Sequence, residues 1–355
     1  MIKVRECIRG MGEYHSPLTN AKVDLRLDLN ESTTGCSPRV LAKIRSLDSK
    51  LLALYPRREA GEKLIADFLG LQPAETFLTN GADEGIDILC RAYLDARDEM
   101  IIVVPAFAMY EIFAQASAAR TVRVPAMPDY NFPVEGILQA ITPRTRLIVI
   151  TNPNNPTGIL AARTDILRVL QAAPDAAVLL DEAYFDFCGE TLVDQVGRIP
   201  NLFVTRTFSK AYGLAGVRLG VLAGHAEQIG LLRRIAPPFN INVFALECLA
   251  EALDDREFVQ TYVNQVRRTR EWLRGELEKM GFKCWPSETN FLLAYFGELR
   301  LQILQGMEAQ GIALRDRPDC EGCLRISIGT QQEMDRVLAV LKKIVAQKPA
   351  WQAVR

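Results

Sequence analysis

The sequence predicts an α/β protein with a mostly parallel seven-stranded sheet, helices on both of its faces, and a smaller α+β domain. Between about residues 76 and 224, short apolar runs alternate with amphipathic stretches, as in repeated β–α units. After about residue 240 the pattern changes to a long helical stretch followed by mixed strands and helices. The 355 residues, 49% of them hydrophobic, allow a core large enough for two domains.

Seven apolar runs are expected to form the large sheet. Six read as buried strands, because parallel strands are covered on both faces and lack polar alternation. A seventh run at 217–223 completes the sheet. The six buried runs lie at 76–79, 100–104, 120–124, 147–150, 177–180 and 202–205, with helical patterns between them at about 83–94, 107–118, 133–141 and 163–172.

The C-terminal third is predicted to form the smaller domain. A helical stretch at about 242–280 is interrupted near Asp254 and Asp255. Strand-like and helical runs then follow one another, at 281–285, 290–295, 299–310, 311–315, 323–328 and 331–346. This domain should therefore contain both helices and strands.

Composition argues against several kinds of function. A net charge of −1 without basic clusters does not predict a surface that binds nucleic acid. No apolar run is long enough to cross a membrane and the N-terminus lacks an apolar targeting segment, so a cytoplasmic protein is expected. Eight scattered cysteines fit a reducing compartment, and the single CxxC at Cys320 and Cys323 lacks the further ligands of a zinc site. No metal is expected.

The most informative stretch is TFSKAYGLAGVR at 207–218. It places the amine of Lys210 beside the hydroxyls of Thr207 and Ser209, with the guanidinium of Arg218 eight residues on. This set suits a lysine that forms a Schiff base with an aldehyde cofactor whose phosphate binds nearby. A partly buried, cationic pocket would lower the pKa of the amine. The chain has only two histidines, which leaves Lys210 as the candidate base.

Four polar groups follow predicted strands. Asn80 with Gly81, Asn152, Asp181 and Lys210 come after the runs that end at 79, 150, 180 and 205. Ligands of open α/β sheets bind beyond the carboxyl ends of the strands, so these groups are expected to meet at one edge. The carboxylate of Asp181 needs a partner there, because an isolated charge at the end of an apolar strand is unstable.

Three motifs in this order resemble the fold-type I pyridoxal-phosphate (PLP) aminotransferases: the Asn-Pro-rich loop 152–158, Asp-Glu-Ala-Tyr at 181–184, and Ser209-Lys210 with its trailing Arg218. The resemblance covers almost the whole chain. It implies the PLP-dependent transferase fold type I, with an antiparallel strand at 217–223. It also implies a homodimer whose substrates are a small-molecule amino donor and a 2-oxo acid acceptor.

The same resemblance implies a domain division. A large PLP-binding domain would span 41–253 and a small C-terminal domain 254–355. The N-terminal segment 1–40 would pack back onto the small domain, which would then be discontinuous in sequence.

The resemblance implies three catalytic residues. Lys210 would form the Schiff base and then move the Cα proton of the substrate. Asp181 would keep the pyridine nitrogen of PLP protonated, which makes the ring an electron sink; capping of the following helix is its alternative role. Tyr184 and Asn155 match the positions that hydrogen-bond the cofactor O3′, although Asn152 and Asn154 lie in the same proline-rich turn.

Binding of the cofactor phosphate is expected at the start of the helix after Gly81, where free N–H groups and the helix dipole favour an anion. Arg218 is expected to begin an apolar strand, where an unpaired cation would be unstable. The resemblance implies five phosphate ligands: the amides of Ala82 and Asp83, the hydroxyls of Thr207 and Ser209, and the guanidinium of Arg218.

Two tyrosines complete the expected cofactor site by resemblance. Tyr110 would stack on the pyridine ring, with a place in the core as its alternative role. Tyr55 would reach the phosphate in the neighbouring subunit, so that the site would be complete only in a dimer.

Two arginines, together with Asn155, are the expected substrate ligands. Arg325, in CLRISIGT, resembles the arginine that binds the substrate carboxylate through a bidentate pair. Arg315, in ALRD, resembles a second arginine that meets a distal anion; an exposed ion pair with Asp316 is its alternative role.

Within the family, the chain most resembles the histidinol-phosphate aminotransferases, through NGADEG at 80–85, PSETNF at 286–291, and the segments around Arg315 and Arg325. This implies transfer of an amino group between L-histidinol phosphate and 2-oxoglutarate in histidine biosynthesis. Three alternatives share the fold: an aromatic or broad-range aminotransferase, a threonine-phosphate decarboxylase, and a PLP-binding regulator. The last would need a DNA-binding module, and no basic recognition helix is evident.

Two stretches depart from the family pattern. Asn30-Glu31-Ser32-Thr33-Thr34 lacks the aromatic residue and proline that often follow Asn-Glu in the family. The N-terminal cover over the substrate is therefore left open, with Tyr14 as one candidate for the missing aromatic. The stretch 237–242 differs as well. These differences bear on substrate choice and hardly touch cofactor chemistry.

Overall fold

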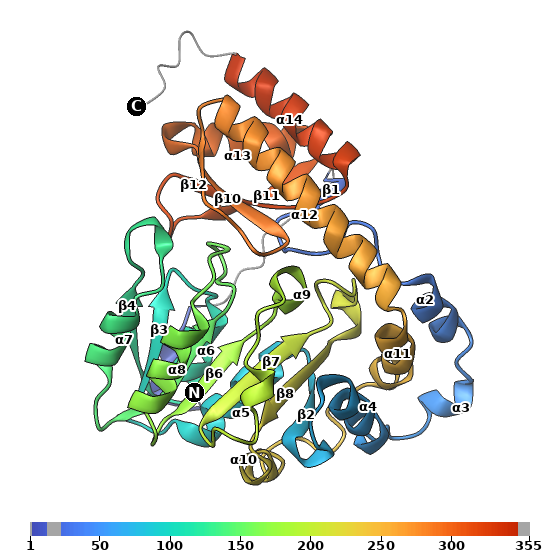
Figure 1. The fold of residues 1–355 in the computed structure, drawn as a ribbon, viewed down its shortest axis with the longest axis vertical. Coiled ribbons are helices and arrows are strands. Elements are labelled where there is room, and N and C mark those ends of the chain that lie inside the picture. Colours follow the sequence, from blue (N-terminus) through green and yellow to red (C-terminus); the bar gives the residue numbers. More distant parts are fainter. Residues whose placement is uncertain (1, 13–22, 347–355) are drawn as a thin grey trace.

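The computed structural model describes residues 2–12 and 23–346 and contains two sheets, one above the other in Figure 1. The larger sheet has seven strands in the order β2-β8-β7-β6-β5-β3-β4. These strands are β2 (Thr76–Asn80), β3 (Glu99–Val104), β4 (Arg120–Pro125), β5 (Thr145–Thr151), β6 (Ala177–Asp181), β7 (Leu202–Thr207) and β8 (Leu219–Gly224). All seven predicted runs are strands.

The large sheet is mostly parallel. Strands β4, β3, β5, β6 and β7 pair in parallel, whereas β8 is antiparallel to both β7 and β2. The predicted fold class and the antiparallel strand are therefore confirmed. The expectation that 120–124 is a buried strand is wrong, because β4 lies at the edge with one neighbour and only its Val124 is buried.

Helices cover both faces of this sheet, as repeated β–α units require. On one face, Ile148 and Val178 pack with residues of α7 (Val134–Ala140) and α8 (Arg163–Ala172). On the other face, Val149 and Leu179 pack with α5 (Ala82–Tyr93), α6 (Met109–Ala116) and α10 (Ala226–Leu232). Neighbouring residues of one strand enter opposite cores because side chains alternate along a strand.

The smaller sheet has the strand order β1-β11-β12-β10-β9 and packs with three helices into its own core. Its strands are β1 (Leu25–Leu27), β9 (Lys283–Cys284), β10 (Phe291–Tyr295), β11 (Ile312–Arg317) and β12 (Cys323–Ser327); its helices are α12 (Arg256–Lys279), α13 (Arg300–Ala309) and α14 (Gln331–Ala346). The predicted α+β character of this part is confirmed.

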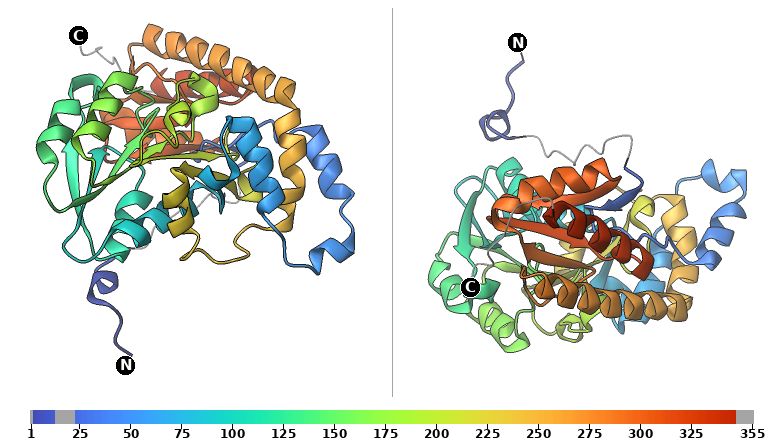
Figure 2. Two further views of the ribbon diagram at one scale, coloured as in Figure 1. Left: turned by 60° about the horizontal axis from the view of Figure 1, so that its bottom comes forward. Right: turned by 90° about the horizontal axis from the view of Figure 1, so that it is seen from above.

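The N-terminal residues divide between the two parts of the molecule. Strand β1 pairs in parallel with β11, so an early segment joins the C-terminal sheet. In contrast, α1 (Glu6–Arg9) lies against α6 of the large sheet (Figure 2). Helix α2 (Pro38–Arg45), which precedes α3 (Ser49–Leu52) and α4 (Glu59–Leu69), packs on α11 (Val243–Asp254). The division at residues 40 and 253 stays a prediction.

The interruption predicted near Asp254 and Asp255 is the boundary between α11 and α12. Asp255 lies between the two helices, and its carboxylate accepts the backbone N–H of Phe258. This side chain therefore caps the second helix, which explains why one long amphipathic stretch forms two helices.

Candidate active site

A cavity of about 540 Å³ lies where the carboxyl ends of the parallel strands face the smaller sheet. Thr151, Asp181 and Thr207, the last residues of β5, β6 and β7, line one side of it, and Arg315 and Arg325 of β11 and β12 line the other. The cavity contains all but one of the predicted site residues: Ala82, Asp83, Tyr110, Asn155, Asp181, Tyr184, Thr207, Ser209, Lys210, Arg218, Arg315 and Arg325.

Lys210 lies at the centre of this set. Its Nζ donates to the backbone carbonyl of Leu29, 3.0 Å away, so the N-terminal segment holds the amine in place. Burial, and next the positive charge of Arg325, lower the pKa of Lys210 to about 8. The expected depression of the amine pKa is confirmed, and its main cause is loss of water.

Asp181 ends β6 and is buried, with 4% of its surface exposed. Its Oδ1 accepts the backbone N–H of Ala183 at 3.0 Å, and its Oδ2 accepts the hydroxyl of Tyr110 at 2.6 Å. Burial raises the pKa of Asp181 to about 6, while the Tyr110 hydrogen bond opposes that rise. The carboxylate therefore binds the following turn and faces the cavity. The capping alternative is wrong, because the next helix, α9 (Phe185–Cys188), begins after Tyr184 and no side chain of the described residues caps it.

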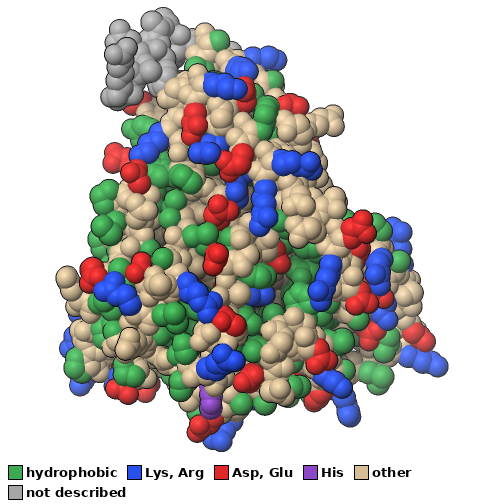
Figure 3. All heavy atoms as spheres, in the orientation of Figure 1, with side chains coloured by type: hydrophobic (Ala, Val, Ile, Leu, Met, Phe, Trp, Pro, Cys, Tyr) green, Lys and Arg blue, Asp and Glu red, His purple; other side chains and the backbone are tan. Residues whose placement is uncertain are grey.

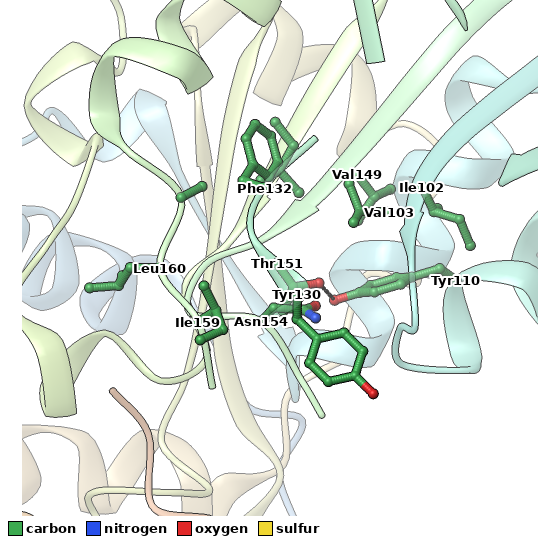
Figure 4. Close-up of a pocket in the computed structure, with 12 residues that line it drawn as sticks. Ile102, Val103, Tyr110, Tyr130, Phe132, Val149, Thr151, Asn154, Ile159 and Leu160 are labelled. Atoms are coloured by element: carbon green, nitrogen blue, oxygen red, sulfur yellow. Dashed lines mark hydrogen bonds between the residues drawn. The ribbon is translucent and has the colours of Figure 1, made fainter. Parts of the chain in front are cut away.

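Tyr110 makes a contact that the sequence did not indicate. Its hydroxyl lies 2.8 Å from that of Thr151 (Figure 4), and it also donates to Asp181. Its ring is fully buried and meets the ring of Phe107 edge-on, with centroids 5.7 Å apart. Phe107 also lines the cavity and was missed. The stacking role of Tyr110 stays a prediction; its contact with the carboxylate of Asp181 is observed.

The anion end of the cavity is built where β2 leads into α5. Gly81 has φ +76°, and a Cβ atom there would lie 2.3 Å from Nη2 of Arg218, so a glycine is required. Arg218 Nη2 pairs with Asp83 Oδ2 at 3.1 Å. Nearby, the Thr207 hydroxyl donates to the Ser209 hydroxyl at 3.0 Å. Hydroxyls, a guanidinium and the start of a helix thus converge, as an anion site needs.

Arg218 lies in the cavity, but the expectation that it begins an apolar strand, where an unpaired cation would be unstable, is wrong. Arg218 precedes β8 with φ +58°, its side chain is 41% exposed, and it is paired with Asp83. An exposed, paired guanidinium incurs little desolvation, so its proximity to the other anion-binding groups is the better evidence.

The structure distinguishes the three asparagines of the loop. Asn155 lines the cavity, and its Oδ1 accepts from Nη1 of Arg325 at 2.6 Å. Asn152 instead accepts the backbone N–H of Ala161. Asn154 donates to the carbonyl of Pro105 and lines a small adjoining hollow of about 20 Å³ (Figure 4). Of the three, the geometry singles out Asn155.

The two predicted arginines lie opposite each other on neighbouring strands. Arg325 is buried, and its Nη2 donates to the carbonyl of Asp28 at 2.6 Å. The expected alternative for Arg315, an ion pair with Asp316, is wrong because Asp316 pairs with Arg300. Within residues 2–12 and 23–346, Arg315 makes no hydrogen bond or ion pair, so its guanidinium is available to a ligand.

Arg317 is a third cavity arginine that the sequence argument missed. It pairs with Asp319 and donates to the carbonyl of Ala106 at 3.1 Å. It shares one face of β11 with Arg315, and that two-residue spacing is the signal that could have indicated it.

Three further sequence-derived candidates lie apart from this cavity or outside the described residues. Tyr55 is 77% exposed and stacks on Phe239 with ring centroids 4.4 Å apart. Cys320 and Cys323 are buried beside Trp285, and the described part of the chain contains no group of three metal-ligating side chains. Tyr14 lies outside the described residues.

Comparison with known proteins identifies the family of the chain. A family model described as "Aminotransferase class I and II" matches residues 22–341. The chain belongs to this family. A histidinol-phosphate aminotransferase of Roseiflexus castenholzii is 36% identical over 333 residues, covering 90% of this aminotransferase and 89% of the relative. Another, of Thermoanaerobacter pseudethanolicus, is 33% identical over 355 residues, covering 96% and 98%.

Solved structures share the fold of this aminotransferase. The crystal structure of histidinol-phosphate aminotransferase from Sinorhizobium meliloti, in complex with pyridoxal-5′-phosphate, superposes with a TM-score of 0.89. It is 24% identical and covers 98% of each chain.

On the face shown in Figure 3, acidic and basic side chains are interspersed without a basic patch. Among the helices of residues 2–12 and 23–346, none is long and apolar enough to cross a membrane.

Proposed function

We propose that this aminotransferase uses PLP to transfer an amino group between L-histidinol phosphate and 2-oxoglutarate, with imidazole-acetol phosphate and L-glutamate as the products. The observation that carries the proposal is one cavity holding Lys210 and Asp181 together with Arg315 and Arg325. Relatives that are 33% and 36% identical are named for this reaction, which supports the choice of substrate.

The residues of the cavity fit PLP at three points. Lys210 supplies an amine of lowered pKa for the aldehyde. Asp181 supplies a buried carboxylate for the ring nitrogen. The third point is the anion end, where the close approach of Arg218 to Gly81 would be blocked by any side chain at that glycine. An aldehyde, a basic ring nitrogen and a phosphate are thus each matched by a group of complementary chemistry.

Bound here, PLP would supply an electron sink for the α-carbon of the substrate. Asp181 would hold a proton on the ring nitrogen, since its carboxylate is fixed by Tyr110 and Ala183. Lys210 Nζ would take the proton from the substrate Cα, because a pKa of about 8 leaves part of the amine neutral near pH 7. Asn155 and Tyr184 would donate to the phenolic oxygen of the cofactor.

The arginines would orient the substrates. Arg325 would bind the α-carboxylate of glutamate through its guanidinium, which Asn155 and the carbonyl of Asp28 already hold in position. Arg315 would bind the distal anion, which is a phosphate in one substrate and a carboxylate in the other. A half-buried guanidinium that presents several N–H donors can bind either a phosphate or a carboxylate.

The proposed enzyme acts as a homodimer in which Tyr55 reaches the partner's cofactor phosphate. Tyr55 and Phe239 form an exposed aromatic stack, and other large apolar side chains near them in sequence are exposed as well. Exposed apolar side chains of this size are typical of surfaces that bind another protein. These are Leu52, Leu54 and Phe244.

A survey of half-reactions tests the substrate. The PLP-loaded protein is mixed with single amino donors, and loss of the visible absorbance of the bound cofactor is followed. Rapid conversion by histidinol phosphate and glutamate is expected, and a preference for phenylalanine or tyrosine would favour the aromatic alternative. Release of CO₂ from threonine phosphate would indicate the decarboxylase. For the cofactor, Lys210→Ala should lose the adduct that borohydride traps; retention of that adduct would contradict the assignment.

A further inference from the structure

Asn30 lies in the cavity wall with a left-handed backbone conformation, φ +56°. Among residues other than glycine, asparagine and aspartate tolerate this conformation best. The residue is 1% exposed, and its backbone carbonyl accepts from the side-chain amide of Asn290 at 3.0 Å. Asn30 is therefore held by the small sheet's neighbouring loop while its side chain points toward the large domain.

The hydrogen bonds of Asn30 define the orientation of its side-chain amide. Its backbone N–H donates to Oγ of Ser327 at 3.0 Å, so this hydroxyl uses a lone pair there and donates its own proton to Oδ1 of Asn30. The Nδ2 of Asn30 is then the group that faces Tyr184, 2.8 Å from its Oη. Because an amide nitrogen only donates, Tyr184 Oη accepts this bond.

Tyr184 is buried, with 3% of its surface exposed, and it lines the cavity. Among the described residues its hydroxyl proton has no hydrogen-bond acceptor, while a lone pair is occupied by Asn30. A hydroxyl that accepts one hydrogen bond becomes a stronger donor in another, because the two bonds polarise each other. The Tyr184 hydroxyl proton is consequently left to bond a ligand.

We propose that Asn30 is a positioning residue that turns the Tyr184 hydroxyl proton into the cavity, toward the phenolic oxygen of the cofactor. This inference rests on the proposed function, because it needs PLP in the cavity. Asn30 acts through Tyr184, and it couples the small sheet, through Ser327, to the hydroxyl that faces the cofactor.

The pH at which the visible absorbance of the PLP-loaded protein changes provides the test. With PLP bound to Lys210, the phenolic oxygen of the cofactor would help to hold a proton on the lysine nitrogen. A hydrogen bond that Tyr184 donates to this oxygen would weaken that hold, so the proton would be lost at lower pH. Asn30→Gly removes the amide and keeps the positive φ. The midpoint of the absorbance change in the Asn30→Gly variant should rise by roughly half a pH unit to one pH unit, which is the range that one hydrogen bond accounts for.

Asn30→Gly is also measured in a Tyr184→Phe background, where no hydroxyl remains to be turned. Tyr184→Phe alone should raise the midpoint, and Asn30→Gly should add less than about 0.2 unit to it. Thr33→Val is the matched control, because Thr33 bonds Glu333 from the same segment and does not touch Tyr184. It should change thermal stability and leave the midpoint where it was.

The outcomes separate the inference from the proposed function. A wild-type midpoint in Asn30→Gly, or equal shifts with and without the Tyr184 hydroxyl, overturns the positioning role alone. Failure of the wild-type chain to bind PLP overturns both proposals. If the glycine variant does not fold, Asn30→Asp replaces it: a carboxylate accepts the Tyr184 proton, so its shift must be larger with Tyr184 present than with Tyr184→Phe.

Discussion

The hydroxyl of Tyr110 donates to Oδ2 of Asp181 across 2.6 Å, from a helix 71 residues earlier in the chain. Both groups are buried, so this bond is the main side-chain support of a carboxylate that has lost nearly all its water. It lowers the pKa of Asp181 against the effect of burial. The acid limb of the pH profile of kcat/KM should therefore depend on Tyr110.

Tyr110→Phe tests that dependence. Loss of the donor should raise the pKa of Asp181 above about 6, shift the acid limb of kcat/KM to higher pH and lower kcat/KM by roughly tenfold or more. Thr151→Val is the control, since it removes the second hydroxyl and leaves the donor to Asp181 in place. An acid limb that does not move in Tyr110→Phe would show that the bond does not tune the carboxylate.

The amine of Lys210 should give the cofactor-free protein a pH-dependent stability. Its pKa of about 8 is lower than the ordinary lysine value of 10.5, so between these values the unfolded chain binds more protons. Stability therefore rises with pH through this window, by up to about 3 kcal/mol. Urea unfolding of the wild type and of Lys210→Met, compared from pH 7 to 11, should show this rise only in the wild type. Parallel curves would contradict the lowered pKa.

Arg325 should be needed for its geometry as well as its charge. Arg325→Lys keeps the charge and loses the planar fork, along with the bonds to Asn155 and the Asp28 carbonyl. The KM of glutamate should rise by about 100-fold, the effect of losing charge-assisted hydrogen bonds. Arg336→Lys, at an exposed arginine of the same domain, should leave the KM of glutamate unchanged. Wild-type KM in Arg325→Lys would rule out bidentate binding.

Arg315 should discriminate substrates by their distal charge. Arg315→Gln should lower kcat/KM for histidinol phosphate by roughly 100-fold, because it removes the partner of a dianion. A donor with an uncharged side chain, such as phenylalanine, should change by less than about threefold. Arg300→Gln, which removes the partner of Asp316, controls for disturbance of β11. Equal losses for both donors would place the distal anion elsewhere.

Tyr55 should complete the cofactor site of the neighbouring subunit. Tyr55→Ala and Lys210→Ala homodimers should each be nearly inactive, whereas a refolded equimolar mixture should recover about a quarter of wild-type activity. Half of the dimers would then be hybrids, each with one site that holds both residues. No recovery, with dimers confirmed by sedimentation, would place Tyr55 within its own subunit's site. An active Tyr55→Ala homodimer would place it outside any site.

The sequence by itself determined the fold class and most of the cavity. Alternating apolar runs and helical patterns predicted a mostly parallel sheet, and the strand ends located Asp181 and Lys210 at one edge. These features are local: strand periodicity and residues directly after a strand depend on neighbours in sequence. The edge position of β4 was missed, because pairing order is not written in a strand's own residues.

Only the tertiary structure decided which side chains act on one another. The choice of Asn155 among three asparagines, the bond from Tyr110 to Asp181 and the bond from Asn30 to Tyr184 depend on contacts between residues 71 to 170 positions apart. The contacts of Asn155 with Arg325 and of Asn30 with Tyr184 form because the small sheet packs across the carboxyl ends of the large one, whereas Tyr110 reaches Asp181 from a helix that covers the large sheet. A hydrogen bond requires its two atoms within about 3 Å, and no sequence pattern specifies such a distance across two separately folded sheets.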